Sequence, residues 1–136
     1  LYWAEKGEGA FCNDRRLRVS ARGDLESALF ATGLPFKGRP GRERALSEVD
    51  RVLENTAGVR RYGAAALDLA YVAAGRFDAY WERGLHNWDV AAGIVLVREA
   101  GGFVSEIAGG PKPALEGSIL AANAEIYEKA KILLNG

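Results

Sequence analysis

The chain has 136 residues, 49% of them hydrophobic, and its 18 basic and 18 acidic side chains give a net charge of zero. A chain of this length and apolar content can bury a core of single-domain size. The balanced charge argues against a dedicated nucleic-acid binder and against binding to anionic membranes, although a local basic patch is compatible with it. The single cysteine, Cys12, cannot form an internal disulfide, and no segment approaches the roughly 20 apolar residues of a membrane span. We therefore expect a protein of the reducing cytoplasm in which Cys12 is a small packing residue.

The first half of the chain alternates short apolar segments with segments rich in glycine or proline. In chain order it predicts a strand, a turn and a second short strand over 1–20, a strand over 28–32, a loop over 33–41, a helix over 41–55 and a strand over 58–62. In the helix, Leu46, Val49 and Leu53 recur at helical spacing. We expect these three to form its inner face while the charged residues, Glu48 among them, lie elsewhere.

The second half repeats the alternation of helices and strands. It predicts a helix over 64–74 closed by Gly75, a strand over 77–82, a helix from 88 or 89 to 100, a strand over 103–107, a turn over 109–113 and a strand over 118–122. Asn123 is expected to cap a final helix whose apolar face is made by Ile126, Ala130, Leu133 and Leu134. Strands separated by helices favour a mixed sheet that contains parallel pairs.

One carboxylate, Asp89, stands just before an apolar run that ends on the pair Gly101 and Gly102. A side-chain oxygen at this point can accept hydrogen bonds from the first turn of a helix, or it can hold a metal. By chemistry alone the capping role is favoured, because aspartate is a common cap and metal ligands are rare. The small residues Ala91, Ala92 and Gly93 would let a neighbouring backbone or a ligand approach closely, and Ile94, Leu96 and Val97 are expected to face inward.

Two further candidates lie where strands give way to other elements, which is where ligands tend to sit in such sheets. The Gly63–Ala65 turn suits an anion at a helix start, and it equally suits close packing of a helix on a sheet. Glu82 ends an aromatic strand, and its carboxylate could accept hydrogen bonds from the vicinal hydroxyls of a polyol. From sequence alone a solvated strand end is the favoured interpretation for Glu82. His86 has no second ligand at metal-binding spacing, so we expect a loop or interface histidine.

The segment Trp88–Gly102 resembles the second signature of the inositol monophosphatase family, W-D-x-A-A-G followed by an aliphatic helix and Gly-Gly. Residues 5–13, 60–68 and 77–82 are similar to other segments of that family, in the same order and spacing. The family's first signature, D-P-[IL]-D-G-T, which supplies two aspartates and a backbone carbonyl to metals, does not occur here. Because the chain also opens on residues typical of the middle of a strand, we expect it to be the C-terminal half of a longer protein.

The resemblance implies an α/β fold, namely the C-terminal half of a sugar-phosphatase-like α-β-α-β-α layered sandwich with a mixed sheet flanked by helices. Residues 1–22 would be a strand pair that completes the sheet of a missing N-terminal domain, and residues 23–136 would form a C-terminal α/β domain. The implied activity is that of an enzyme that hydrolyses inositol monophosphate to inositol and phosphate with Mg²⁺. The chain alone is expected to be inactive, because one carboxylate cannot hold two or three Mg²⁺ ions against their hydration.

The resemblance also assigns roles to particular residues. Gly63, Ala64, Ala65, Glu82 and Asp89 would bind the substrate, and Asp89 would also donate a carboxylate to the metal next to the leaving group. Ala64 stands where the family often has Ser or Thr, so one hydroxyl contact to the substrate is absent from this chain. The residues that activate the nucleophilic water belong to the missing half.

Partners follow from the same comparison of motifs. Arg60 and Arg61 lie in a region that resembles a subunit contact of the family, so we expect a homodimer. No partner membrane or nucleic acid is indicated. The second hypothesis is a non-catalytic regulatory or assembly module, since some members of the family act with the transcription machinery. Within the enzyme class, histidinol phosphate, fructose bisphosphate and nucleotide phosphates are the alternative substrates.

Overall fold

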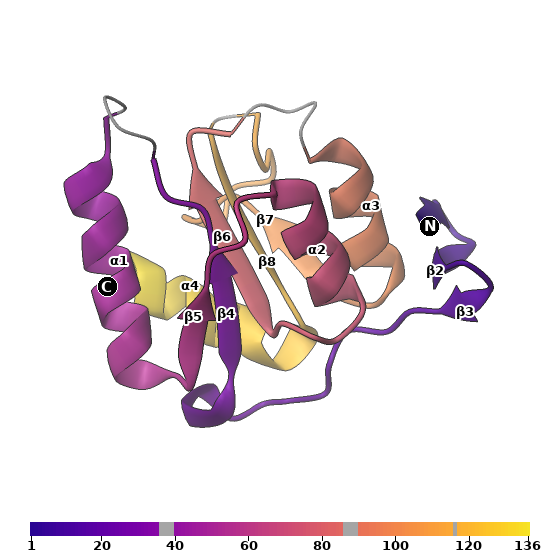
Figure 1. The fold of residues 1–136 in the computed structure, drawn as a ribbon, viewed down its shortest axis with the longest axis horizontal. Helices are drawn as coiled ribbons and strands as arrows, with labels where there is room; N and C mark the ends of the chain where they lie inside the picture. The colour runs from indigo at the N-terminus through magenta and orange to yellow at the C-terminus, as the bar shows by residue number, and fades with distance from the viewer. Residues whose placement is uncertain (36–39, 86–89, 116) are drawn as a thin grey trace.

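The computed structural model describes residues 1–35, 40–85, 90–115 and 117–136, which form two sheets flanked by helices (Figure 1). The three-stranded sheet has the order β1-β2-β3 and contains β1 (Tyr2–Glu5), β2 (Gly9–Cys12) and β3 (Arg15–Arg16). The five-stranded sheet has the order β5-β4-β6-β8-β7 and contains β4 (Leu29–Thr32), β5 (Gly58–Arg60), β6 (Ala79–Arg83), β7 (Phe103–Ser105) and β8 (Ser118–Ala122). The α-helices are α1 (Arg42–Asn55), α2 (Ala65–Ala73), α3 (Ala91–Glu99) and α4 (Ala124–Asn135), and Leu25–Ser27 forms a 3₁₀ turn.

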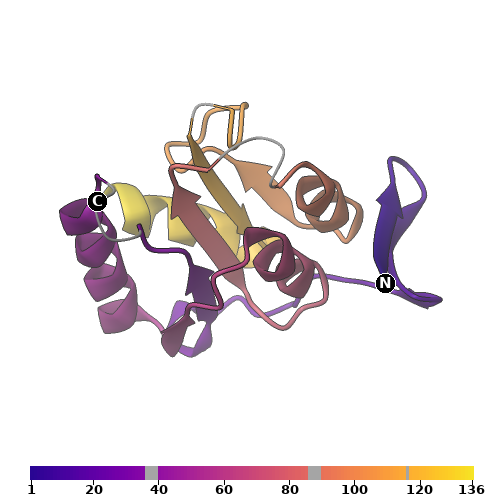
Figure 2. The same ribbon diagram turned by 45° about the horizontal axis from the view of Figure 1, so that its top comes forward.

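The larger sheet is mixed, as the sequence predicts. Strand β4 pairs in parallel with β5 and β6, whereas β8 pairs antiparallel with β6 and β7. Helices α1 and α4 cover one face of this sheet, α2 and α3 cover the other, and the small sheet lies beyond α3 (Figure 2). The predicted layered α/β architecture is therefore confirmed.

Alternation along the strands gives each face of the larger sheet its own core. Phe30 and Trp81 point to the side of α1 and α4, where they meet Val52 and the apolar face of α4. Their neighbours Ala31 and Tyr80 point to the side of α2 and α3. Because Glu82 follows Tyr80 at a spacing of two, its side chain leaves the sheet on the same side as that of Tyr80.

The expected inner face of α1 is wrong at two of its three positions, whereas the third, Val49, is partly buried against the core. Leu46 and Leu53 are 48% and 52% exposed, whereas Glu48 is buried. The reason is a buried ion pair in which Arg83 donates from Nε and Nη2 to Glu48 Oε2 at 3.0 and 2.8 Å. Trp81 Nε1 donates to the other oxygen of the same carboxylate at 3.3 Å. A carboxylate satisfied in this way can occupy an inward position that a count of apolar residues assigns to leucine.

The N-terminal region contains one strand more than the predicted pair, and it is tied to α3. Glu99 of α3 accepts hydrogen bonds from the backbone N–H groups of Gly7 and Gly9 at 3.0 and 2.8 Å. These two bonds hold the pKa of the Glu99 carboxyl below its usual value. Cys12 is partly buried against the core on the side of α2 and α3, in the packing role expected for it. The predicted domain boundary after residue 22 stays a prediction.

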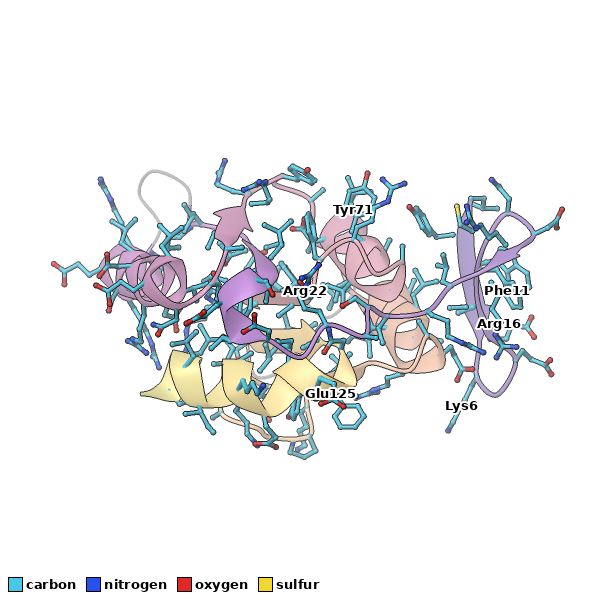
Figure 3. The ribbon with its side chains drawn as sticks, turned by 90° about the horizontal axis from the view of Figure 1, so that it is seen from below. Lys6, Phe11, Arg16, Arg22, Tyr71 and Glu125 are labelled. Carbon is cyan, nitrogen blue, oxygen red and sulfur yellow. The ribbon has the colours of Figure 1, made fainter. Side chains whose placement is uncertain are left out.

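The connection from this region to β4 is held by polar side chains at the lower edge of the sheet, which Figure 3 views directly and on which it labels Arg22. Buried Asp78 accepts hydrogen bonds from the Ser20 hydroxyl and, at 2.8 Å, from the backbone N–H of Leu29, and it pairs with Arg22 at 3.3 Å. Asn123 donates to Ser20 Oγ at 2.8 Å and accepts from the first turn of α4 at 2.7 Å, so the predicted cap is confirmed. In the described part of the chain, no helix has both the length and the apolar character needed to cross a membrane.

Candidate functional site

The predicted site residues gather at the edge of the sheet opposite to Asp78. Because β5, β4 and β6 run in parallel, their carboxyl ends meet at one edge, which is the upper edge in Figure 1. Gly63–Ala65 follows β5 and opens α2, Gly33 follows β4, and Glu82 lies near the end of β6. The structure therefore brings the predicted residues Gly63, Ala64, Ala65 and Glu82 to the same edge.

Glu82 is not a freely solvated strand end. The hydroxyl of Tyr80, which is fully buried, donates to Glu82 Oε1 at 2.5 Å. The backbone of Gly33 lies directly against the same carboxylate, since a Cβ atom on Gly33 would stand 2.1 to 2.4 Å from its three atoms. The favoured interpretation of Glu82 from sequence alone is thus wrong, because the carboxylate is partly buried and has fixed neighbours.

Asp68 is a functional-site residue that the sequence reasoning did not single out. It is 1% exposed on α2, and its Oδ1 atom is buried with no hydrogen-bond partner among the described residues. Burial, and after it the charge of Glu82, raise the pKa of Asp68 to about 7. The signal that could have found it is an acid placed between Leu67 and Leu69 in a helix otherwise made of apolar residues. Buried carboxyls with strongly raised pKa values cluster at functional sites.

The start of α2 has the character of an anion site. Ala64 is its N-cap residue and provides no side-chain hydrogen bond to the first-turn amides. Gly63 adopts a φ of +81°, and no described atom lies within 4 Å of where its Cβ would stand. Close packing of helix on sheet therefore does not explain Gly63, whose backbone conformation disfavours other residues. Amides at a helix start that its N-cap side chain does not satisfy are suited to a negatively charged group.

Gly93, one of the small residues at the start of α3, allows close packing of this helix against α2. A Cβ on Gly93 would lie 2.6 and 2.7 Å from Cδ1 and Cβ of Leu69, so α2 and α3 approach each other closely there. Ile94, Leu96 and Val97 are buried as predicted. Gly101 has a φ of +93° and ends the helix.

Asp89 and His86 lie outside the described residues, so the choice between a cap and a metal ligand for Asp89 stays a prediction. Within the described ranges, no group of three or more His, Cys, Asp or Glu side chains could hold a metal ion. Glu82 and Asp68 are two carboxylates, and among the described residues no third ligand side chain joins them. The described residues thus do not by themselves form a magnesium site.

A cavity of about 200 Å³, which Glu82 helps to line, lies between α1 and the end of β6. Its described lining comes from the β4–α1 connection, α1 and the end of β6: Gly33, Leu34, Pro35, Pro40, Gly41, Ala45, Glu48, Trp81, Glu82, Arg83 and Gly84. Arg60 ends the edge strand β5 and is exposed, as is Arg61. Their expected role in a homodimer stays a prediction.

Comparison with known proteins agrees with this geometry. The chain is 52% identical over 129 residues to the inositol-1-monophosphatase of Caulobacter vibrioides, covering 93% of this chain and 50% of that protein. It is 48% identical over 128 residues to the Nus factor SuhB of Escherichia coli, covering 94% of this chain and 48% of that protein. The structure of the inositol monophosphatase from Anabaena matches with a TM-score of 0.92 and 40% identity, covering 98% of this chain and 55% of that one.

The chain thus spans about half the length of the relatives it matches. The family model described as the inositol monophosphatase family matches residues 1–134, which is nearly the whole sequence. The sequence motifs and the layered mixed sheet agree with this match. The chain therefore belongs to the inositol monophosphatase family.

Proposed function

We propose that this chain is the C-terminal part of a Mg²⁺-dependent phosphomonoesterase that hydrolyses inositol monophosphate to inositol and phosphate. The observation that carries the proposal is the fixed carboxylate of Glu82 at the same sheet edge as the uncapped start of α2. The names of the relatives support a phosphatase of this family.

Both features suit the oxygen atoms of a polyol phosphate. A carboxylate accepts hydrogen bonds from neighbouring ring hydroxyls, and backbone amides at a helix start donate to oxygen atoms of a polar or anionic ligand. We assign the ring hydroxyls to Glu82 and to the Gly63–Ala65 turn, and a metal-directed carboxylate to Asp89. When bound, Mg²⁺ would neutralise the phosphate and lower the pKa of a bound water.

The chain alone is proposed to be inactive. Its sequence carries one predicted metal ligand, Asp89, and no D-P-[IL]-D-G-T signature. A single carboxylate does not compete with water for several Mg²⁺ ions. We further propose that the complete protein is a cytoplasmic homodimer that uses Arg60 and Arg61 at its subunit contact.

A chimera tests these statements directly. The half of the Caulobacter vibrioides enzyme that precedes the matched region would be fused to the start of this chain, and phosphate release from inositol 1-phosphate would be measured with and without Mg²⁺. We expect activity from the chimera, none from the chain alone, and at least a hundredfold loss in Asp89→Asn. Activity of the chain alone would refute its inactivity, and a folded but inactive chimera would refute the proposed function.

The alternative is a non-catalytic regulatory or assembly module. The similarity to a protein named as a Nus factor supports this alternative. The two functions differ in their need for carboxylates, since a scaffold has no chemical use for Glu82 or Asp89. Histidinol phosphate, fructose bisphosphate and nucleotide phosphates would be assayed beside inositol 1-phosphate. A higher kcat/KM for one of these than for inositol 1-phosphate would change the assigned substrate but not the reaction class.

A further inference from the structure

We propose that Tyr80 and Gly33 are positioning residues that fix the carboxylate of Glu82 in the orientation that accepts hydroxyl groups of the substrate ring. The contact between these residues is a property of the described chain. The role of this contact in substrate binding rests on the proposed function. Neither residue has a role in the sequence-based assignment above.

Tyr80 is a rigid donor. Its side chain is fully buried in the core on the side of α2 and α3, and it shares a strand face with Glu82. The 2.5 Å distance from its hydroxyl to Glu82 Oε1 lies in the range of hydrogen bonds that end on an ionised acceptor. Since the ring cannot move without disturbing the core, the position of the hydroxyl is set before any ligand binds.

Gly33 supplies the space that the carboxylate occupies. The ideal Cβ on Gly33 would lie 2.1 Å from Oε1, 2.2 Å from Cδ and 2.4 Å from Oε2 of Glu82. These atoms are the far end of a flexible side chain, so an alanine at position 33 would displace the carboxylate rather than the sheet. The substitution therefore moves one functional group while the fold is kept.

Fixing the carboxylate in advance should strengthen substrate binding more than the chemical step. A glutamate side chain that is ordered only on binding loses rotamer freedom at that moment, which weakens affinity. The neighbouring Asp68 adds a second reason for a donor, because its charge would oppose that of Glu82 and the Tyr80 hydroxyl stabilises the carboxylate. We expect KM to rise about three- to tenfold without the hydroxyl or with the carboxylate displaced, and kcat to stay within twofold.

The test uses the active chimera with Tyr80→Phe and Gly33→Ala. Tyr127→Phe is the matched control for the first, since the Tyr127 hydroxyl makes a hydrogen bond of 2.6 Å to Ser105 Oγ away from the site. Gly58→Ala is the control for the second, since a Cβ there meets only ordinary contacts at 3.4 and 3.7 Å. We expect raised KM values in the two site variants alone, with similar melting temperatures in each matched pair.

A second measurement does not depend on activity. In proton NMR spectra of the 136-residue chain, the Tyr80 hydroxyl should give a slowly exchanging downfield signal that disappears in Tyr80→Phe and shifts in Glu82→Gln. No shift in Glu82→Gln would overturn the contact. An active chimera whose KM is unchanged by both site variants would overturn the positioning role while leaving the proposed function intact. An inactive, folded chimera with the NMR signal present would overturn the proposed function. It would also overturn the role of the contact in substrate binding.

Discussion

Replacing Asp68 by Asn should make the stability of the protein less dependent on pH. The carboxyl is buried beside Glu82, and these two influences raise its pKa from 3.8 to about 7. Below pH 3.8 Asp68 is protonated in both the folded and the unfolded chain. Between the two pKa values the folded chain holds a proton that the unfolded chain has released, so stability falls as the pH rises toward 7. Asn removes the ionisation and with it this loss.

The size of the effect follows from the shift. A change of about 3 pKa units corresponds to roughly 4 kcal/mol if it acts in full, since one unit is 1.36 kcal/mol. Burial is the larger cause of the shift, and the solvent around the partly exposed Glu82 screens only the smaller, charge-based part, so we expect about 3 kcal/mol. The loss develops mostly between pH 4 and pH 7 and is complete above pH 8.

Urea unfolding followed by tryptophan fluorescence measures the effect, because Trp81 is buried in the core. Between pH 5 and pH 8 the free energy of unfolding of Asp68→Asn should gain about 1 to 2 kcal/mol relative to the unsubstituted chain. Asp50→Asn, at an exposed position on α1, is the matched control and should show no such gain. Parallel curves for Asp68→Asn and the unsubstituted chain would show that the buried carboxyl is ionised throughout, and the argument from burial would fail.

Three further substitutions test contacts that hold the fold together. Gly93→Ala should lower the free energy of unfolding by about 1 to 3 kcal/mol in urea titrations, because its Cβ would collide with Leu69 of α2. Asn123→Ala should cost about 2 kcal/mol or more by the same measurement, because it removes a helix cap and leaves buried partners unsatisfied. Glu99→Gln should lower the protection factors of the Gly7 and Gly9 amides at neutral pH, measured by hydrogen exchange and corrected for the intrinsic rate. Acid should lower the same protection factors in the unsubstituted chain once Glu99 is protonated, since these amides hold the pKa of Glu99 below its usual value.

Most elements of the fold could be predicted from the sequence because their signals are local. The strand over Ser118–Ala122 and the cap at Asn123 depend on residues within a few positions of each other, and both are confirmed. The inner face of α1 could not be predicted in this way. Glu48 turns inward because Arg83, 35 positions along the chain, pairs with it. A periodicity count contains no information about such a partner.

The candidate site shows the same division between local and distant information. Glu82 was found by its place at a strand end and by the family motif. Its fixed orientation depends on Gly33, which follows a different strand, β4, and no local pattern reveals this close approach. The contact of Tyr80 with Glu82 is predictable from the sequence, because residues two apart on a strand share a face and a tyrosine there can donate to a carboxylate. Asp68 carries a local signal, an acid between two leucines of an apolar helix, but its burial beside Glu82 depends on elements distant in the sequence.

The two edges of the large sheet differ in how completely their polar groups are satisfied, and this difference bears on where a ligand binds. At the lower edge Asp78 and Asn123 form a buried network that closes the connection from the N-terminal region. At the upper edge, within the described part of the chain, the start of α2 has no side-chain cap and an oxygen of Asp68 is buried without a partner. Unsatisfied groups of this kind cost stability, and they persist where the rest of the fold is stable enough to hold them. A ligand that supplies hydrogen bonds at the upper edge would recover that cost. We therefore expect ligand binding to protect the amides of α2 and β6 from hydrogen exchange more than those around Asp78.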